Sequence, residues 1–297
     1  MRALEADLRA CGAGDGFASA EALRTGIAGS RPVDAGPNAA LVARFDIERH
    51  ALGGRGVFTL SPRDAAPLAH VLCLHGGAFV YEMSDPQWGL LGELMARVPI
   101  TLTLPLFPLA PERRVREIAA FVRHAYGAFH AAALGAPTVV LGMSAGGALA
   151  LGLDRTIRER GEQQPDALLL VSPWLDLSCS DAAQPAIAHI DPMLALPGLR
   201  EAGRMYAGDL ALDDPRVSPL FGDLTGLPRT LVLAGDHDVL VADARRLAAR
   251  AASPTLTLRE YAGAIHMWPE RDTPESTAAL DEAAAFVRIT ASAHGLR

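Results

Sequence analysis

The feature that most constrains this chain is a short apolar run that breaks into glycine and serine. Residues 138–147 read T-V-V-L-G-M-S-A-G-G and lead into an alanine-rich segment. This pattern predicts a buried strand, a sharp turn and a helix. Such a turn exposes the hydroxyl of Ser144 at the tip of the strand, while Gly142 and Gly146 remove side chains that would collide as the chain reverses. Ser144 is therefore a candidate nucleophile.

The G-x-S-x-G pentad alone is weak evidence for a nucleophile. A chain of 297 residues with 28 glycines contains such a pentad by chance in roughly one case in ten. A small-residue turn can also bind phosphate, but no G-K-[S/T] follows here. It is the position of the pentad between a strand and a helix that favours a nucleophile.

Composition limits the classes of function. Half of the residues are hydrophobic and the formal net charge is -7, so the chain has no general electrostatic attraction to nucleic acid or to an anionic membrane. The N-terminus is charged and amphipathic, unlike a signal peptide, and no uninterrupted apolar run could insert into a membrane. The three cysteines are scattered without metal-binding spacing, which favours a reducing compartment. We expect a cytoplasmic protein with no metal site; its oligomeric state stays open, with a homodimer as one option.

Apolar strands alternate with helices through most of the chain. Residues 45–50 and 56–60 predict a hairpin around Gly53 and Gly54. The alternation that follows predicts an α/β fold with a mostly parallel central sheet flanked by helices. The predicted strands are 70–74, 100–104, 138–141, 167–171, 230–233 and 255–261, and the predicted helices are 86–97, 113–133, 145–160, 241–252 and 274–292.

Two segments do not fit the alternation. Residues 174–226 separate two predicted strands and contain one helical pattern near 199–206; an insertion of this kind should lie over the strand ends as a cap. Residues 1–44 form either a loosely packed extension or part of the same cap. The resulting division is an N-terminal cap segment at 1–44, an α/β core at 45–173 and 227–297, and a cap insertion at 174–226.

Candidate partners of Ser144 follow later strands, where open α/β sheets bind their ligands. A serine hydroxyl needs a base to take its proton, and a buried carboxylate orients an imidazole base. His266 lies after the strand that ends near residue 261. For the carboxylate we prefer Asp238, with Asp236 as the first alternative and Asp243 as the second. The order Ser, Asp, His is that of a triad on an α/β-hydrolase sheet.

Glycines after the strand at 70–74 offer donors for a developing oxyanion. Backbone N–H groups of Gly76, Gly77 and Ala78, together with that of Ala145, are the predicted oxyanion hole. A tight turn with no catalytic role is the alternative for these glycines. The neighbouring His75 is expected to be structural, and His237 to be exposed.

Seven short motifs are spread along the chain: H-G-G-A-F at 75–79, L-A-P-E at 109–112, G-M-S-A-G at 142–146, S-P-W-L-D at 172–176, D-P-M-L at 191–194, D-P-R-V-S-P-L at 214–220 and G-L-P at 226–228. Taken together, they resemble those of the hormone-sensitive-lipase-like carboxylesterases of the α/β-hydrolase superfamily. The resemblance covers the chain from about residue 45 onward and implies a cofactor-free serine hydrolase of short acyl esters, capped by the N-terminus and by a segment after the sixth strand. It assigns the nucleophile to Ser144, the acid to Asp238 and the base to His266. One departure is Ala78, which stands where the family has a third glycine; its methyl group could narrow the acyl side of the site.

Other residues are expected to have roles outside the triad. Glu112 and Asp176 are expected to be structural hydrogen-bonding groups near the site. Met143, Met193, Met205 and Tyr206 are candidates for lining the substrate pocket, with packing of the cap on the core as the alternative.

The leading hypothesis is therefore a serine carboxylesterase that acts on a small or medium acyl ester, such as an acetylated metabolite or a lactone. An amide or formamide hydrolase would need the same triad. A non-catalytic receptor would not need to keep the base, and a membrane-acting lipase would need exposed apolar or basic surface.

Overall fold

The apolar strands form one eight-stranded sheet in the computed structural model, which describes residues 1–30, 36–251 and 253–294. The strand order is β1-β2-β4-β3-β5-β6-β7-β8. Strand β2 runs antiparallel to both of its neighbours, and all other pairs are parallel. The predicted hairpin and the predicted mostly parallel sheet are confirmed. The strands are β1 (Phe45–Leu52), β2 (Arg55–Pro62), β3 (Ala69–Leu74), β4 (Ile100–Pro105), β5 (Thr138–Met143), β6 (Ala167–Val171), β7 (Arg229–Gly235) and β8 (Leu256–Tyr261).

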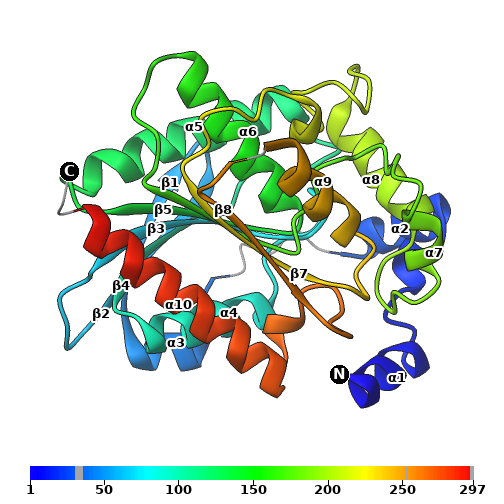
Figure 1. Ribbon diagram of the computed structural model, residues 1–297, viewed down its shortest axis with the longest axis horizontal. Coiled ribbons are helices and arrows are strands. Elements are labelled where there is room, and N and C mark those ends of the chain that lie inside the picture. Colours follow the sequence, from blue (N-terminus) through cyan, green and yellow to red (C-terminus); the bar gives the residue numbers. More distant parts are fainter. Residues whose placement is uncertain (31–35, 252, 295–297) are drawn as a thin grey trace.

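Helices cover both faces of this sheet (Figure 1). Helices α5, α6 and α9 lie on one face, and α3, α4 and α10 lie on the other. The helices are α1 (Arg2–Ala10), α2 (Ala20–Gly29), α3 (Ala39–Arg44), α4 (Asp85–Arg97), α5 (Val115–Ala132), α6 (Ala145–Glu159), α7 (Gln184–Ala188), α8 (Leu196–Ala207), α9 (Val241–Ala251) and α10 (Pro274–His294).

The central strand β3 shows why two helical layers are needed. Leu72 and Leu74 pack toward α5 and α6, whereas Val71 and Cys73 pack toward α4 and α10. All four side chains are fully buried. Because successive side chains of a strand point to opposite faces, a continuous apolar run requires cover on both sides.

The N-terminal segment lies against the insertion between β6 and β7. Helices α2, α7 and α8 gather at one end of the sheet in Figure 1. A guanidinium nitrogen of Arg24 in α2 lies 2.7 Å from a carboxylate oxygen of Glu201 in α8. Gly198 allows a close approach, because a Cβ atom there would lie 2.5 Å from the backbone of Phe17. Parts of three predicted segments, residues 31–35, 252 and 295–297, lie outside the described residues.

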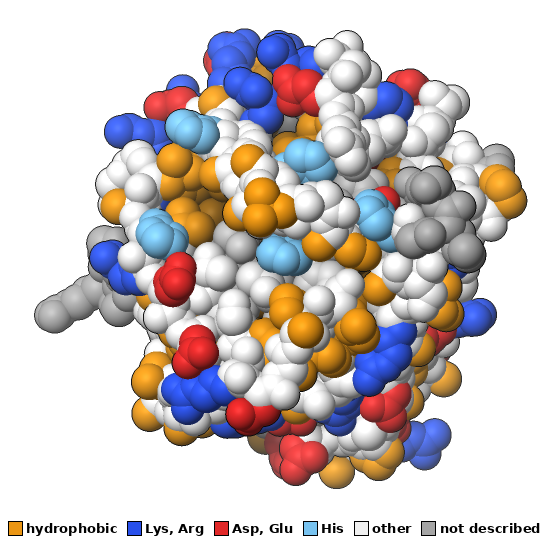
Figure 2. Space-filling model, turned by 90° about the vertical axis from the view of Figure 1, so that its left-hand side faces the viewer, with side chains coloured by type: hydrophobic (Ala, Val, Ile, Leu, Met, Phe, Trp, Pro, Cys, Tyr) orange, Lys and Arg blue, Asp and Glu red, His pale blue; other side chains and the backbone are white. Residues whose placement is uncertain are grey.

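The remaining features concern the helices, the cysteines and the charged surface of the molecule. Within the described ranges, none of the helices combines the length and the apolar character that a membrane crossing requires. Cys11, Cys73 and Cys179 are all unpaired. Figure 2 shows one face of the molecule, on which acidic and basic side chains are mixed and neither sign forms a continuous patch.

Candidate active site

Ser144 occupies a strained turn between β5 and α6. Its backbone has φ 50° and ψ -117°, a region that side-chain-bearing residues adopt only when the surroundings enforce it. Its N–H donates to the carbonyl of Val171 at 2.9 Å, and its carbonyl accepts from Gly147 at 2.9 Å and from Trp174 at 3.0 Å. The neighbouring strand and the first residues of the insertion thus hold the turn in place.

The glycines around Ser144 are required by close backbone contacts. A Cβ atom at Gly142 would lie 2.6 Å from the carbonyl oxygen of Gly146. At Gly146, it would lie only 1.9 Å from the carbonyl oxygen of Leu74. Both contacts are with backbone atoms, which cannot rotate away as a flexible side chain can. The steric reason for glycine inferred from the sequence agrees with this geometry.

The structure brings Ser144, His266 and Asp238 into one hydrogen-bonded chain. The Oγ of Ser144 lies 3.0 Å from Nε2 of His266, and Nδ1 of His266 lies 2.9 Å from Oδ2 of Asp238. Ser144 is 7% exposed, His266 is 6% exposed and Asp238 is fully buried. With the proton of the imidazole on Nδ1, Nε2 is free to accept from the serine.

The two alternative carboxylates lie elsewhere. Asp236 accepts from the N–H of Gly263 at 2.6 Å, as the sequence analysis allowed for a loop-bonding aspartate. Asp243 is fully buried and accepts from the N–H groups of Leu175 and Asp176, both at 2.8 Å. Neither of these carboxylates contacts His266.

A second buried carboxylate, Asp191, holds the loop that carries Asp238. Its Oδ2 accepts from the N–H of Val239 at 2.9 Å, and its Oδ1 accepts from Met193 and Leu194 in its own turn. Burial, together with the charge of Asp238, raises the pKa of Asp191 to about 6. Asp191 belongs to the D-P-M-L motif, but its role could not be predicted from the sequence because its contact with Val239 depends on the tertiary fold.

The carboxylates also determine the basicity of His266. Burial lowers the pKa of His266, but the charge of Asp238 and the hydrogen bond to it raise that pKa, and Asp191 adds to the rise. The net shift is upward. The surroundings of His266 therefore stabilise the imidazolium that forms when the imidazole accepts a proton.

Free backbone donors lie in the loop after β3 and at the start of α6. Among the described residues, the N–H groups of Gly77, Ala78 and Ala145 donate to no acceptor. Gly77 has φ +117°, and a Cβ atom there would lie 2.4 Å from the carbonyl oxygen of Tyr81. Ala78 has φ 53°, so this position accepts a methyl group at the cost of a left-handed backbone. Gly76 lies against the nucleophile, since a Cβ atom on it would be 3.2 Å from that of Ser144.

Two histidines outside the triad can be placed. His75 is fully buried, its Nδ1 donates to the carbonyl of Gly76 at 2.6 Å, and its ring stacks on Phe107. Burial lowers the pKa of His75 to about 4, so it is a neutral structural group. The expectation that His237 is exposed is wrong: its side chain is 30% exposed, and Nδ1 lies 3.2 Å from a carboxylate oxygen of Glu5 in α1.

The two acidic groups expected to be structural differ from each other. Asp176 is fully buried and accepts from Ser178, Ser180 and Arg246. The expectation for Glu112 is wrong, because its side chain is exposed and forms no hydrogen bond with any described residue. A short motif identifies the position of an acidic residue but not whether a partner lies within reach.

The candidate pocket residues occupy different environments. Met143 is fully buried in the core between the sheet and α4 and α10, away from open space. Met193 and Met205 are half-buried at the insertion. Tyr206 is buried and stacks on Phe79, with ring centroids 3.9 Å apart. Of the four, Tyr206 is joined most directly to the oxyanion loop, since Phe79 follows Ala78.

No group of three or more His, Cys, Asp or Glu side chains could hold a metal ion within the part of the chain that the structure describes.

Comparison with known proteins agrees with the fold. Residues 71–270 match a family model described as the α/β-hydrolase fold. An esterase of Acinetobacter venetianus is 31% identical over 222 residues, which cover 72% of each chain. An acetyl-hydrolase of Streptomyces hygroscopicus is 30% identical over 281 residues, which cover 85% of this chain and 90% of the relative.

A solved structure gives the same result. The crystal structure of an esterase from the bacterial hormone-sensitive lipase family has a TM-score of 0.79, with 24% identity over 91% of this chain and 90% of that one. At this identity the likeness shows the fold, while the family model and the two relatives show the membership. The chain belongs to the α/β-hydrolase family, as its hormone-sensitive-lipase-like motifs predicted.

Proposed function

We propose that this protein is a serine carboxylesterase that hydrolyses short-to-medium acyl esters through an acyl-enzyme. The observation that carries the proposal is the hydrogen-bonded chain from Ser144 through His266 to Asp238 beside three free backbone donors. The names of the relatives, an esterase and an acetyl-hydrolase, support ester chemistry and a short acyl group. The three unpaired cysteines favour a reducing compartment, so we propose the cytoplasm as the location.

In the first half of the reaction, His266 takes the proton of Ser144 as Oγ attacks the ester carbonyl carbon. The carbonyl π electrons move to oxygen, and the N–H groups of Gly77, Ala78 and Ala145 donate to the resulting oxyanion. As the tetrahedral intermediate collapses, the bond from the acyl carbon to the alcohol oxygen breaks. His266 gives its proton to the leaving alcohol, and Ser144 is left acylated.

In the second half, water repeats the attack on the acyl carbon. His266 takes a proton from the water, the same donors bind the new oxyanion, and the bond between Oγ and the acyl carbon breaks. The proton returns to Oγ as the carboxylic acid leaves. Asp238 keeps the imidazole in the required tautomer throughout and stabilises its protonated form.

We further propose that residues 1–44 and 174–226 act as the cap over this site. The packing of α2 on α8 through Arg24 and Glu201, and the stacking of Tyr206 on Phe79, support this role. A cap of this kind excludes water and limits the size of the acyl group. The methyl group of Ala78 would narrow the same space.

The experiment is hydrolysis of p-nitrophenyl acetate, butyrate, octanoate and laurate by the wild type and by Ser144→Ala. We expect activity on the short chains and a loss of kcat on the order of 10⁶-fold in Ser144→Ala. Circular dichroism of Ser144→Ala controls for its folding.

Two results would contradict the proposal. A folded wild type that cleaves only amides would identify an amidase on the same triad. A folded wild type that is inert to esters and amides, yet binds an ester analogue, would identify a receptor.

A further inference from the structure

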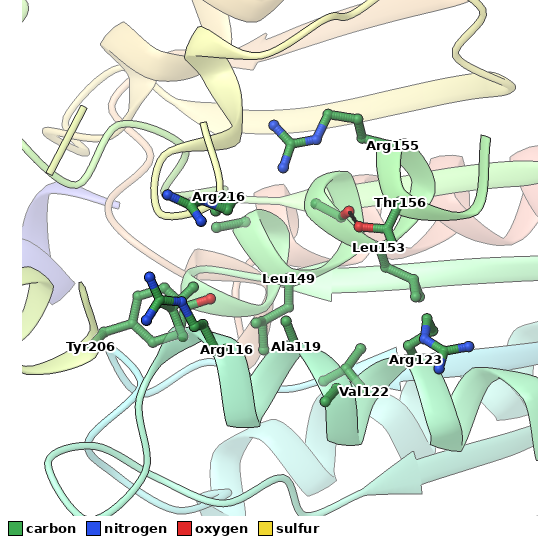
Figure 3. Close-up of a pocket in the computed structure, with 14 residues that line it drawn as sticks. Arg116, Ala119, Val122, Arg123, Leu149, Leu153, Arg155, Thr156, Tyr206 and Arg216 are labelled. Carbon is green, nitrogen blue, oxygen red and sulfur yellow. Dashed lines mark hydrogen bonds between the residues drawn. The ribbon is translucent and has the colours of Figure 1, made fainter. Parts of the chain in front are cut away.

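A cavity lies between helices α5 and α6, and none of the triad residues lines it. It has a volume of about 260 Å³ and is closed at one end by Tyr206 of α8. Figure 3 shows apolar side chains of both helices in its middle and arginines on either side.

The charged lining of this cavity is entirely basic. Arg116 and Arg123 of α5 lie on one side, and Arg155 of α6 and Arg216 lie on the other (Figure 3). None of the described residues that line the cavity is acidic. Four cations around one cavity stand out in a chain whose formal net charge is -7. Such a cluster favours an anionic ligand.

Each arginine has an acidic neighbour outside the cavity. Arg216 donates to both carboxylate oxygens of Asp214, from Nε at 2.9 Å and from Nη2 at 2.6 Å, and its Nη1 makes no hydrogen bond with a described residue. The separations are 3.1 Å for Arg116 with Asp209 and 2.6 Å for Arg216 with Asp214, and more than half of each guanidinium-bearing side chain is exposed. The pair between Arg116 and Asp209 uses only Nη1 of Arg116 and contributes little, so a ligand anion can bind the other nitrogens of Arg116 and the Nη1 of Arg216. Arg155 is 12% exposed. Its Nε makes no hydrogen bond with a described residue but lies 3.5 Å from a carboxylate oxygen of Glu159, and its Nη1 donates to the carbonyl of Pro215 at 2.9 Å. Arg155 therefore adds positive charge to this side of the cavity rather than a free donor.

The floor of the cavity is apolar and has room for a chain. Leu149, Val122 and Ala119 lie along it in Figure 3. Gly152 is open to the cavity, because a Cβ atom there would meet no heavy atom within 4 Å. From Val115 to Arg123, the groove follows α5 for about 12 Å at the rise of an α-helix. An alkyl chain fits this floor better than a compact inorganic anion does.

Tyr206 separates the cavity from the active site. Its ring stacks on Phe79, the residue after Ala78 in the oxyanion loop. In Figure 3 the tyrosine reaches toward the cavity beside Arg116 and Arg216, so its hydroxyl adds a donor at the end where two arginines meet. A carboxylate head is best placed at this end, with its chain running toward Arg123.

We propose that the groove between α5 and α6 is a binding site for a medium-chain alkyl carboxylate, separate from the catalytic site. The carboxylate accepts charge-assisted hydrogen bonds from Arg116 and Arg216, and the chain lies on the apolar floor around Leu149 and Gly152. The proposal does not depend on the esterase activity, because none of these side chains belongs to the triad.

The first test is isothermal titration of the full chain with octanoate, butyrate and octanol. We expect octanoate to bind, and the affinity to fall as salt is raised, because exposed charges are screened. Butyrate lacks the chain and octanol lacks the charge, so each should bind at least about tenfold more weakly. Equal binding of octanol and octanoate would overturn the proposal.

The second test locates the site with matched variants. Gly152→Leu in α6 fills the groove, whereas Gly127→Leu makes the same change in α5, at a position where a Cβ atom also meets nothing within 4 Å. The double variant Arg116→Gln/Arg216→Gln removes the head-group donors, and Arg259→Gln removes an exposed, ion-paired arginine elsewhere.

We expect Gly152→Leu and the arginine double variant to weaken octanoate binding by at least about tenfold, and both controls to leave it unchanged. Thermal unfolding of each variant tests that it is folded. Octanoate that binds Gly152→Leu as well as the wild type would place the ligand elsewhere, for example at the triad, and would refute the proposed site.

Discussion

The loop after β5 and the loop after β7 carry two members of the same triad but are held in different ways. The turn at Ser144 is marked in its own sequence by closely spaced glycines, although Leu74, Val171 and Trp174 contact it from elsewhere in the chain. The loop at Asp238 has no such mark and is held by distant groups: Asp191 bonds Val239, and Glu5 bonds His237. Both loops depend on long-range contacts, but only the turn at Ser144 also has a local sequence signal.

The largest effect should separate the two aspartates of the β7 loop. Asp238→Asn disturbs the tautomer of His266 and should lower kcat by about 10³- to 10⁴-fold. Asp236→Asn is the matched change two residues away. It removes the charge but keeps an oxygen that can accept from the N–H of Gly263, so kcat should fall by less than about tenfold. Steady-state kinetics on p-nitrophenyl butyrate will measure both. Equal losses in the two variants would show that the loop responds as one unit.

The second prediction tests the steric need for glycine in the turn at Ser144. Gly146→Ala places a methyl group 1.9 Å from the carbonyl oxygen of Leu74 and should destabilise the protein by about 3 kcal/mol or more. Gly127→Ala, in the open part of α5, should stabilise it by about 0.5–1 kcal/mol. Urea unfolding measures both changes. A fully stable and active Gly146→Ala would mean that the turn is less constrained than its geometry indicates.

These two regions also show how much could be predicted from the sequence. The strand, turn and helix around Ser144 were predictable, because hydrophobic pattern and glycine spacing act over a few residues. The sequence favoured Asp238 over Asp236 without deciding between them, since the choice depends on which carboxylate the tertiary fold turns toward His266. The contact of Asp191 with Val239 was not predicted, because it joins the insertion to the core.

The same limit explains the errors at the surface. His237 was expected to be exposed, but α1 brings Glu5 against it. Glu112 was expected to form structural hydrogen bonds, but no described partner lies within reach. Packing of helices joined by long loops decides both cases, and neither has a periodic signal in the sequence.

The third prediction concerns the long-range contact through Asp191. Asp191→Asn removes a negative charge that raises the pKa of His266, so that pKa should fall. Because the reaction needs neutral His266, the acid limb of the kcat/KM profile should move to lower pH. The new side chain has one oxygen in place of two, so its NH2 group faces the N–H of Val239 and the hydrogen bond there is lost. This loss should lower kcat/KM at alkaline pH by about tenfold.

A matched control tests whether replacing any buried carboxylate would move the acid limb. Asp243→Asn changes another fully buried carboxylate, one that bonds Leu175 and Asp176 rather than the loop at Asp238. Its acid limb should stay where it is in the wild type. An unmoved limb in Asp191→Asn would show that Asp191 acts only through packing.

The smallest effect should come from the contact between α1 and the β7 loop. The ion pair between His237 and Glu5 spans 3.2 Å, with side chains 30% and 19% exposed. His237→Ala should cost no more than about 1 kcal/mol of stability and change kcat/KM by less than about threefold. Thermal unfolding and esterase assays will test this. A loss as large as that of Asp191→Asn would make α1 an essential support of the acid loop.

Trp174 is a natural fluorophore next to the nucleophile, because its backbone N–H donates to the carbonyl of Ser144. The indole is fully buried and packs on Phe79, so a change at the nucleophile or in the oxyanion loop alters its surroundings directly. Trp88 and Trp268, the other two fluorophores of this kind, lie in the core on the opposite face of the sheet. We therefore expect acylation of Ser144 to change the emission of Trp174 more than that of Trp88 or Trp268, with natural substrates that carry no dye.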